Sequence, residues 1–427
     1  MKIAHIAPPW LAIPPKNYGG TEIVLYNLVE EQVAQGHDVT LFAPDDAKTS
    51  AKLVSFFPRS LIEAGVPWQA HLKAFYHYHK AVEYIKSHPF DVVHTHLSSA
   101  SDMYVYPLLD AVSTPVISTL HSRFPFDRVA SWTGNADEHY LEWLASVGII
   151  AISDSAREDV PHDLNFIGVI HHGLPTGTFL PTVERPEDFL VWLGRFFPEK
   201  GAHLAIEAAK ASGRPLVLAG TVDQYIPDSV NYFEHMIKPH IDGQQTRYIG
   251  PVGMQEKVDL FSRAYGMLNP IEWKEPFGMV VIEAMAVGCP VISFAQGAIP
   301  ELVEHGKSGF LVHDLDEMIH CIGKIGSLDR KAIRAYVEKN FSVKVMTEKY
   351  TKAYRKEIKS SLLNASTRHV HSQLSIPGMR TVPPVVPRTT PSPFASSQIS
   401  SKSKASSMSG PFIRTEPPIE PNIESAS

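Results

Sequence analysis

The first 44 residues, "MKIAHIAPPWLAIPPKNYGGTEIVLYNLVEEQVAQGHDVTLFAP" (1–44), decide the fold class. An apolar run over 2–7 predicts a strand, and "HDVTLFAP" (37–44) predicts a second one. Between them, a helix that ends at Gly36 is expected from one apolar stripe: Val24, Leu25, Leu28, Val29 and Val33. Strand, loop, helix and strand in this order are typical of a parallel sheet with right-handed crossovers.

The same alternation of short apolar strands and helices continues along the chain and restarts after a break. Further strands are expected at 91–96, 115–121, 148–153 and 168–172, and then at 189–195, 215–220, 246–250, 265–270, 289–294 and 309–312. The stretch between the two series contains proline and threonine, and its apolar residues follow neither the helical nor the strand period. Two successive series predict an α/β protein with two Rossmann-like domains, whose ligands bind beyond the carboxyl ends of the strands.

These patterns divide the chain into consecutive segments. We expect an N-terminal Rossmann-like domain at 1–174, a linker at 175–188, a C-terminal Rossmann-like domain at 189–341, a closing helix at 342–363 and a tail at 364–427. Serine and proline dominate the tail, so it cannot bury enough apolar surface to offset its ordering entropy. We therefore expect the tail to be disordered.

The composition limits which binding partners and which cellular compartment are expected. The 427 residues carry a net charge of −6 without a basic patch, which gives no reason to expect nucleic acid as a partner. The two cysteines, Cys289 and Cys321, fit a reducing compartment better than a disulfide framework. Residues 1–10 are expected to form a strand and not a signal peptide, and no run of about 18 uncharged apolar residues could span a membrane. We expect a cytoplasmic protein, with a peripheral membrane contact left open.

Two acids in "KEPFGMVVIEAMAVGCPVISF" (274–294) carry the first chemical signal. Glu275 precedes a Pro-Phe-Gly turn, and Glu283 lies within an apolar run that predicts a buried helix. Amides at a helix N-terminus can bind phosphate, and a carboxylate can accept two hydrogen bonds from a vicinal diol. A ligand with phosphate and sugar hydroxyls would use both features. The alternative, which is favoured for this motif alone, is that Glu283 pairs with a cation for structural reasons, because a buried carboxylate needs a partner.

The stretch "GRFFPEKG" (194–201) adds two cations to the same predicted domain. Arg195 ends an expected strand and Lys200 begins the next helix, so both can reach over the same edge of the sheet. A diphosphate at that edge would meet both side chains. Two solvated basic residues are the alternative, but the occurrence of both motifs in one domain favours a ligand site.

On these motifs the chain resembles family 4 of the retaining glycosyltransferases, which has the GT-B fold, over roughly residues 1–360. The resemblance rests on Glu275 and Glu283 as an E-x7-E motif, on the Arg195 and Lys200 pair, on "GGTE" (19–22) and on "PELVEHGKSGFLV" (300–312). It implies that Glu275 contacts hydroxyls of the donor sugar and that Glu283 binds the ribose of the nucleotide. It also implies that Arg195 and Lys200 hold the diphosphate.

The resemblance assigns further residues to the site. His121, which ends "PVISTLH" (115–121), matches a position where the family often has a histidine near the donor sugar; a histidine that caps the strand end is the alternative. Catalytic roles are expected for His121, Glu275, Arg195 and Lys200. Donor contacts are expected from Gly19, Gly20, Arg195, Lys200, Glu275, Phe277, Gly278, Met279 and Glu283, where the two early glycines let the backbone approach donor or acceptor.

The expected reaction moves a hexose from a nucleotide-diphosphate sugar to an acceptor hydroxyl with retention, and needs neither cofactor nor metal. "PPKNYGGTE" (14–22) and "NPIEWKEPFG" (269–278) resemble a bacterial subgroup often labelled tetrahydrobiopterin glucosyltransferase-like, which suggests UDP-glucose. "NPIEW" replaces the Pro-Ser that is commoner in the family, so the resemblance leaves the identity of the donor sugar open. The family implies a front-face mechanism, in which the leaving diphosphate helps to deprotonate the acceptor. The acceptor, a small molecule, a glycan or a lipid, is expected on the N-terminal domain.

Other functions are compatible with parts of the same pattern. A nucleotide-sugar 2-epimerase of the same fold and a non-catalytic nucleotide-sugar binding protein stay open, whereas a nicotinamide dehydrogenase is disfavoured because no G-x-G-x-x-G follows the first strand. Aromatic side chains of the N-terminal domain could line an acceptor surface or pack in the core: Trp10, Tyr18, Trp68, Phe75, Tyr76 and Tyr78.

Two further patterns suggest metal ligands but favour structural roles. "DLD" (314–316) resembles an acid pair that holds metal in transferases of another fold, yet Asp314 is better placed to cap the next helix. His94 and His96 alternate on a strand and face one way, as two zinc ligands could. No third candidate ligand lies at a spacing in the sequence that is typical of a zinc site, so we expect His94 and His96 to be ordinary histidines of a strand.

Overall fold

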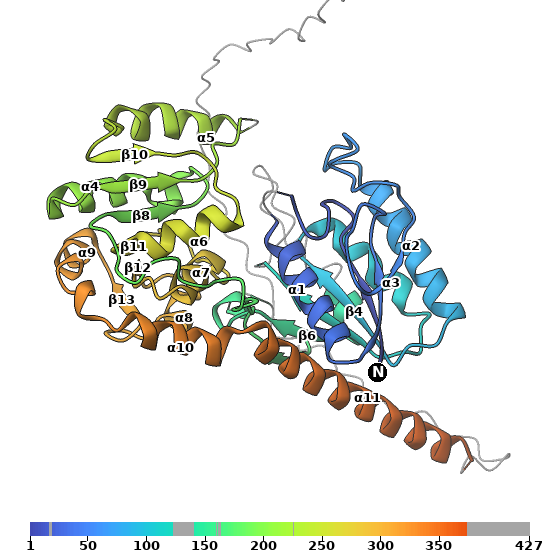
Figure 1. Cartoon of the computed structure of the whole chain (residues 1–427). Helices are drawn as coiled ribbons and strands as arrows, with labels where there is room; N and C mark the ends of the chain where they lie inside the picture. Colours follow the sequence, from blue (N-terminus) through green and yellow to red (C-terminus); the bar gives the residue numbers. More distant parts are fainter. Residues whose placement is uncertain (17–18, 123–140, 159, 161–163, 225, 374–427) are drawn as a thin grey trace, which may run out of the picture. The chain divides into compact units, whose positions relative to one another are not determined.

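The computed structural model describes the chain except for residues 17–18, 123–140, 159, 161–163, 225 and 374–427, and it describes 364–373 only as backbone. Residues Met1–Ser372 form one compact unit. Two parallel sheets with helices on their faces make up this unit, as Figure 1 shows. The predicted fold class, α/β with two Rossmann-like domains, is confirmed.

The first sheet has the strand order β3-β2-β1-β4-β5-β6-β7, and each strand is parallel to its neighbours. Its strands are β1 (Lys2–Ile6), β2 (Asp38–Phe42), β3 (Lys52–Val54), β4 (Val92–Leu97), β5 (Val116–Leu120), β6 (Gly148–Ala151) and β7 (Phe166–Val169). In the register of β1 and β4, His5 lies beside His94. The carboxyl ends of these strands therefore meet at one edge.

The second sheet has the order β10-β9-β8-β11-β12-β13, again parallel. Its strands are β8 (Leu190–Leu193), β9 (Leu216–Ala219), β10 (Thr246–Tyr248), β11 (Gly266–Asn269), β12 (Val291–Phe294) and β13 (Gly309–Val312). Its central strands are nearly continuous apolar runs and are buried, as expected for parallel strands covered on both faces.

Helices cover both faces of each sheet. They are α1 (Gly20–Ala34), α2 (His71–Ser87), α3 (Tyr106–Leu109), α4 (Ala202–Ser212), α5 (Pro227–Tyr232), α6 (Met254–Arg263), α7 (Met279–Ala286), α8 (Ile299–Leu302), α9 (Leu315–Ile322), α10 (Arg330–Phe341) and α11 (Val343–Gln373). In the first sheet, alternate β1 residues face opposite layers: Ile3 packs in the cluster that includes α1, and Ile6 packs in the cluster that includes α2. None of the described helices is long and apolar enough to cross a membrane.

The last helix, α11, belongs to the core of the first sheet although it follows the second sheet in the chain. Met346, Tyr350 and Tyr354 are almost fully buried in the same cluster as the apolar stripe of α1. At the start of α11, the Val343 amide donates to the Leu174 carbonyl (2.7 Å). The expected closing helix therefore exists and contacts the end of the first strand series.

Two sequence expectations need correction. The tail was expected to be disordered from residue 364, but α11 continues to Gln373, because "NASTRHVHSQ" (364–373) contains no glycine or proline that would end a helix. The rest of the tail, 374–427, lies outside the described residues. The expected elements also lack β3 and α2. The buried residues of α2 do follow a helical spacing, at Ala74, Tyr78, Ala81 and Ile85.

Candidate active site

The loop between β11 and α7 presents Glu275 at the carboxyl edge of the second sheet. Gly278, the N-cap of α7, lies in the left-handed region at φ 101°. The Glu275 carbonyl accepts a hydrogen bond from the amide of Ala298 (2.9 Å). A Cβ on Gly297 would lie 2.3 Å from the Glu275 nitrogen, so the two loops can approach only because residue 297 is glycine. Backbone packing thus fixes the position of Glu275.

The side chain of Glu275 pairs with Lys200. Lys200 Nζ lies 2.7 Å from Glu275 Oε2, and Trp273 Nε1 donates to the same oxygen at 3.0 Å. The Lys200 ammonium also lies 4.6 Å from the centroid of the Trp273 ring. The two charged side chains are mostly buried, with 19 and 17% of their surface exposed. The structure therefore brings together two residues that the sequence assigned to one site.

Arg195 lies at the same edge of the sheet. It follows β8, and its guanidinium lies 5.3 Å from the centroid of the Phe197 ring. Lys200 ends the 3₁₀ turn Pro198–Lys200 that leads into α4. Both cations thus follow the carboxyl end of β8, as predicted.

The second acid of the motif, Glu283, also has a cation partner. Lys257 Nζ of α6 lies 2.7 Å from Glu283 Oε1 of α7, and the side chains are 17 and 10% exposed. Sequence reasoning raised such an ion pair as an alternative but did not find Lys257. The sequence "GMQEKVD" (253–259) indicates at most the helix start, where the Gly253 amide donates to Glu256 Oε2 at 2.8 Å, and not the partner of Lys257.

The early glycine loop leads directly into α1. Gly20 is the first residue of α1 and is exposed, whereas Gly19 is buried, and a Cβ there would lie 2.7 Å from Glu22 Oε2. Glu22 was missed by sequence reasoning. Its burial raises its pKa to about 7, its own backbone amide acts in the opposite direction, and the negative charge of Asp102 adds to the increase. A carboxyl group that can be neutral near pH 7 therefore lies against the glycine loop.

His121 follows the end of β5 and joins a group of histidines. Its amide donates to the Leu97 carbonyl (2.8 Å), and its Nε2 lies 3.0 Å from Nδ1 of His96. Its ring stacks on His172 with centroids 5.3 Å apart, and the His172 ring lies 4.8 Å from that of Phe277. One ring therefore separates His121 from Phe277, which the sequence placed in the donor site together with Met279.

The pair His94 and His96 has a third companion. His5, on the neighbouring strand β1, completes a buried group whose ligand atoms lie within 4.8 Å of one another, a third candidate ligand that the spacing along the sequence does not show. Spacing along the chain could not reveal it, because strand pairing brings residue 5 beside residue 94. All six ring nitrogens already have hydrogen-bond partners: Gln32, His96, Tyr354, Thr119, His5 and His121. The geometry is that of a hydrogen-bonded network.

Asp314 has the role that the sequence predicted. It is the N-cap of α9, and its side chain accepts a hydrogen bond from the amide of Glu317 at 2.9 Å. The helix-capping interpretation of "DLD" (314–316) is confirmed.

Comparisons with known proteins identify the chain. The family model described as "Glycosyl transferases group 1" matches residues 182–325, and the model "Glycosyltransferase Family 4" matches residues 18–177. Spore coat protein SA of Bacillus subtilis is 23% identical over 83% of this chain and 100% of its own length. Phosphatidyl-myo-inositol mannosyltransferase of Mycolicibacterium smegmatis is 26% identical over 78% of this chain and 86% of its own. The chain is a GT-B glycosyltransferase of the family 4 type.

Solved structures agree with this fold. Sucrose-phosphate synthase of Thermosynechococcus elongatus superposes with a TM-score of 0.67 at 22% identity, over 84% of this chain and 99% of that one. HepE of Anabaena, solved in complex with UDP-glucose, gives a TM-score of 0.61 at 18% identity, over 83% of this chain and 100% of that one.

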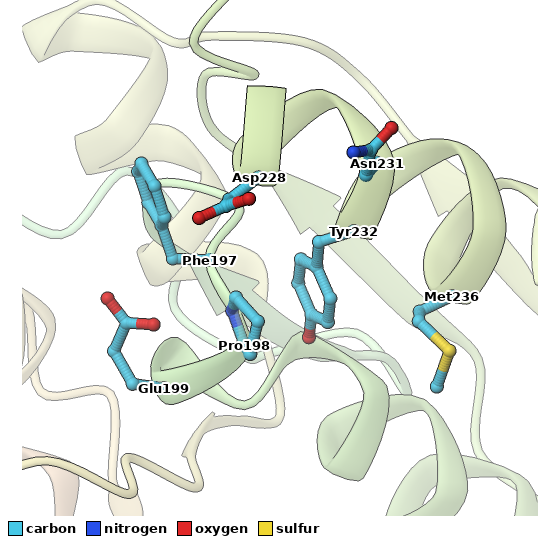
Figure 2. A pocket seen from close by; sticks show the side chains of 7 residues that line it. All are labelled: Phe197, Pro198, Glu199, Asp228, Asn231, Tyr232 and Met236. Carbon is cyan, nitrogen blue, oxygen red and sulfur yellow. The ribbon is translucent and has the colours of Figure 1, made fainter. Parts of the chain in front are cut away.

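The glycosyltransferase has a surface pocket of about 630 Å³ beside the Lys200 turn. Figure 2 shows its lining, in which residues of the loop after β8 face residues of α5 and the turn that follows: Phe197, Pro198, Glu199, Asp228, Asn231, Tyr232 and Met236. Because Glu199 and Asp228 contribute carboxylates, this pocket suits hydroxyl groups better than a diphosphate.

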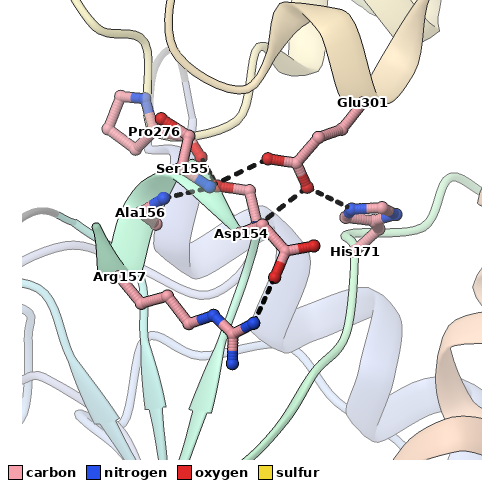
Figure 3. Close-up of polar contacts among 8 residues, drawn as sticks. Asp154, Ser155, Ala156, Arg157, His171, Pro276 and Glu301 are labelled. Carbon is pink, nitrogen blue, oxygen red and sulfur yellow. Dashed lines mark hydrogen bonds and ion pairs between the residues drawn. The ribbon is translucent and has the colours of Figure 1, made fainter.

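Glu301 links the loops of the two sheets. Its carboxylate accepts hydrogen bonds from the amides of Asp154 and Ser155 (both 2.9 Å) and lies 2.9 Å from His171 Nε2, as Figure 3 shows. Burial alone would raise the pKa of Glu301, but the His171 hydrogen bond and the two amides outweigh burial and lower it. Sequence reasoning quoted Glu301 within "PELVEHGKSGFLV" (300–312) but gave it no role.

The aromatic side chains proposed for an acceptor surface fall into two groups. Trp10 and Tyr78 are buried in the core, at 2% exposure each. Trp68, Phe75 and Tyr76 are 50, 37 and 49% exposed in and before α2. Tyr18 lies outside the described residues.

Proposed function

We propose that the enzyme transfers a hexose from a nucleotide-diphosphate sugar to an acceptor hydroxyl, with retention at the anomeric carbon and without a divalent metal. The observation that carries the proposal is the 2.7 Å contact between Lys200 Nζ and Glu275 Oε2. It places a cation suited to a diphosphate directly against a carboxylate suited to sugar hydroxyls.

The remaining residues extend this arrangement along the donor. Arg195, Lys200 and the N-terminal amides of α7 supply positive charge for the diphosphate. Glu283 binds the ribose, with Lys257 holding its carboxylate in place. His121 accepts a hydrogen bond from a hydroxyl of the hexose.

The protein contributes positioning and charge stabilisation to a front-face reaction. The anomeric carbon–oxygen bond to the diphosphate breaks while the acceptor oxygen bonds to the same face of that carbon. The leaving diphosphate takes the acceptor proton. Its negative charge grows during this step, so cations near it stabilise the transition state more than the ground state.

UDP-glucose is the first donor to test. The stretches "PPKNYGGTE" (14–22) and "NPIEWKEPFG" (269–278) resemble a subgroup labelled as glucosyltransferases, and the structural neighbour HepE was solved with UDP-glucose. The acceptor binds on the N-terminal domain, where Trp68, Phe75 and Tyr76 offer exposed aromatic surface. We place the enzyme in the cytoplasm, since both cysteines are buried free thiols.

The test is a donor screen. The full chain is incubated with UDP-, GDP- and ADP-hexoses, and release of nucleotide is followed first by hydrolysis and then with acceptor pools. The expected result is release from one donor class and a product with the donor's anomeric configuration by NMR. Conversion of the donor to its 2-epimer, or binding of every donor without nucleotide release, would contradict the proposal.

A further inference from the structure

A chain of hydrogen-bonded side chains leads from α1 to His121; we call Gln32, His5, His96 and His121 the histidine chain. Gln32 Oε1 lies 2.8 Å from His5 Nε2, His5 Nδ1 lies 3.1 Å from His96 Nε2, and His96 Nδ1 lies 3.0 Å from His121 Nε2. Gln32, His5 and His96 are buried at 0, 0 and 3% exposure. The first two links are therefore shielded from water.

The direction of the chain is set at Gln32. Its amide nitrogen Nε2 donates to the hydroxyl of Tyr354 at 3.1 Å, so its carbonyl oxygen is the atom that faces His5. A carbonyl oxygen only accepts, and the proton of the first link must therefore be on His5 Nε2.

The same order of donor and acceptor holds in the next two hydrogen bonds of the histidine chain. Burial lowers the pKa of His5 to about 4, despite the hydrogen bond that His5 donates to Gln32, and that of His121 to about 3. Burial, together with the neighbouring histidines, also lowers the pKa of His96 well below its ordinary value. Each ring is therefore neutral near pH 7 and carries one proton. His5 Nδ1 accepts from His96 Nε2, and His96 Nδ1 then accepts from His121 Nε2.

We propose that Gln32, His5 and His96 are positioning residues that hold His121 in the tautomer with its proton on Nε2, so that Nδ1 is a hydrogen-bond acceptor for a hydroxyl of the bound sugar. The inference rests on the proposed function, since it assigns the partner of Nδ1. Among the residues that the structure describes, the shielded Nδ1 atom of His121 has no hydrogen-bond partner.

The anchor of the chain is on α11. The Tyr354 hydroxyl accepts from Gln32 and donates to Nδ1 of His94 at 2.7 Å, and His94 Nε2 donates to Thr119 Oγ1 at 2.7 Å. If the amide of Gln32 were reversed, every ring of the chain would reverse with it, and His121 Nδ1 would become a donor. In the structure the amide nitrogen of Gln32 faces the Tyr354 hydroxyl, and this orientation gives the first of these two states.

The structure supplies a matched pair of variants. Tyr354→Phe removes the hydroxyl that orients Gln32, and Gln32→Met removes the amide itself at nearly constant size. Tyr350→Phe is the control, because Tyr350 is one turn earlier on α11, is equally buried and bonds Thr119 at 2.9 Å without touching the histidine chain.

The experiment reads the tautomer directly. Imidazole 15N shifts are recorded on the full chain without ligand, and the signals of His121 are identified by their loss in His121→Gln. We expect the Nε2–H tautomer of His121 in the wild type and in Tyr350→Phe, and a mixture of tautomers in Tyr354→Phe and Gln32→Met. A wild-type Nδ1–H tautomer, or an unchanged tautomer in both chain variants, would overturn the inference.

Turnover gives the second readout. Because only one tautomer is competent, kcat should fall in proportion to its lost population, by about two- to tenfold, while affinity for free nucleotide is unchanged. A purely structural defect would not follow the NMR populations, and kcat that is unchanged despite a shifted tautomer would also overturn the inference. If no donor is turned over by the wild type, the proposed function fails, whereas the tautomer measurement still decides the histidine chain.

Discussion

Lys257 Nζ lies 2.7 Å from Glu283 Oε1, so the acid assigned to the ribose is also half of a largely buried ion pair. The two roles are compatible, because a largely buried cation at one carboxylate oxygen fixes the direction of the group. They also predict different effects of mutation, since a structural pair affects folding and a ribose contact affects nucleotide binding.

Glu283→Ala should weaken binding of free nucleotide at least tenfold, because the diol loses its acceptor. It should also lower the free energy of unfolding by up to about 3 kcal/mol, because Lys257 is left buried without a partner. Calorimetry with UDP and urea unfolding measure the two effects. Lys257→Met serves as the comparison: it removes the pair but keeps the carboxylate, and equal nucleotide affinity in both variants would refute the ribose contact.

Glu275→Ala should leave nucleotide affinity nearly unchanged and lower turnover by roughly 10²–10³, if its contact with the hexose tightens in the transition state. Steady-state kinetics and calorimetry on the same preparation separate these terms. Trp273→Phe removes only the indole donor to Glu275 Oε2 and should cost much less. A Glu275→Ala enzyme that loses nucleotide binding as strongly as turnover would count against this assignment.

Activity should survive EDTA. The leaving diphosphate carries about two to three negative charges near pH 7, and Arg195, Lys200 and the α7 dipole of about half a charge nearly balance it. Lys200→Ala should therefore lose most turnover, whereas Lys274→Ala should not, because Lys274, in the loop between β11 and α7, has a side chain that is 54% exposed. Loss of activity on chelation with rescue by Mn²⁺ would show that the charge is neutralised in another way.

Glu301→Gln should lower the free energy of unfolding at pH 7 by about 1–3 kcal/mol, because charge-assisted bonds to two amides and His171 are weakened. The lowered folded-state pKa means that this stability is present above the ordinary value of 4.5 and is lost as the pH falls through the folded-state pKa. The difference between Glu301→Gln and wild type should therefore shrink below pH 4.5 in urea titrations. Glu304→Gln, in an exposed pair with Lys307, should have little effect at any pH.

The buried histidines should make the protein sensitive to acid. Burial lowers the pKa of six of them below the ordinary 6.5: His5, His77, His94, His96, His121 and His172. The unfolded chain binds protons below pH 6.5 while the folded chain does not, so stability falls as pH decreases, by up to about 1.4 kcal/mol per pH unit for each ring. Urea unfolding between pH 7.5 and 5.5 measures the slope. His77→Gln should reduce it, and His313→Gln, with a side chain that is 78% exposed, should not.

The sequence predicted the elements whose apolar period is strong and local. Parallel strands are continuous apolar runs, and each strand that was expected from such a run is present. The same local patterns predicted that Glu275, Arg195 and Lys200 lie at the ends of strands or helices. It missed β3, which is three residues long and only partly buried, and so carries little apolar signal.

The parts that could not be predicted depend on pairing between distant segments. Lys257 reaches Glu283 from the preceding helix, and His5 reaches His96 only because β1 lies beside β4. Tyr354 meets Gln32 across 322 positions of the chain. No spacing rule covers such contacts, because they are fixed by strand order and helix packing and not by the local sequence.

The position of α11 has a consequence for how the protein is made. Tyr350 and Tyr354 fill the apolar layer over the first sheet, and Ile358 packs against the same cluster. Synthesis from Leu174 to Ile358 adds 358 − 174 = 184 residues, which takes on the order of 10 to 40 s at ~5–20 residues per second. During that time one apolar face of the first sheet is covered by α1 but lacks the side chains of α11 on the nascent chain. A ribosome that stops anywhere in this interval would release a chain whose earliest strands still need a partner that has not been made.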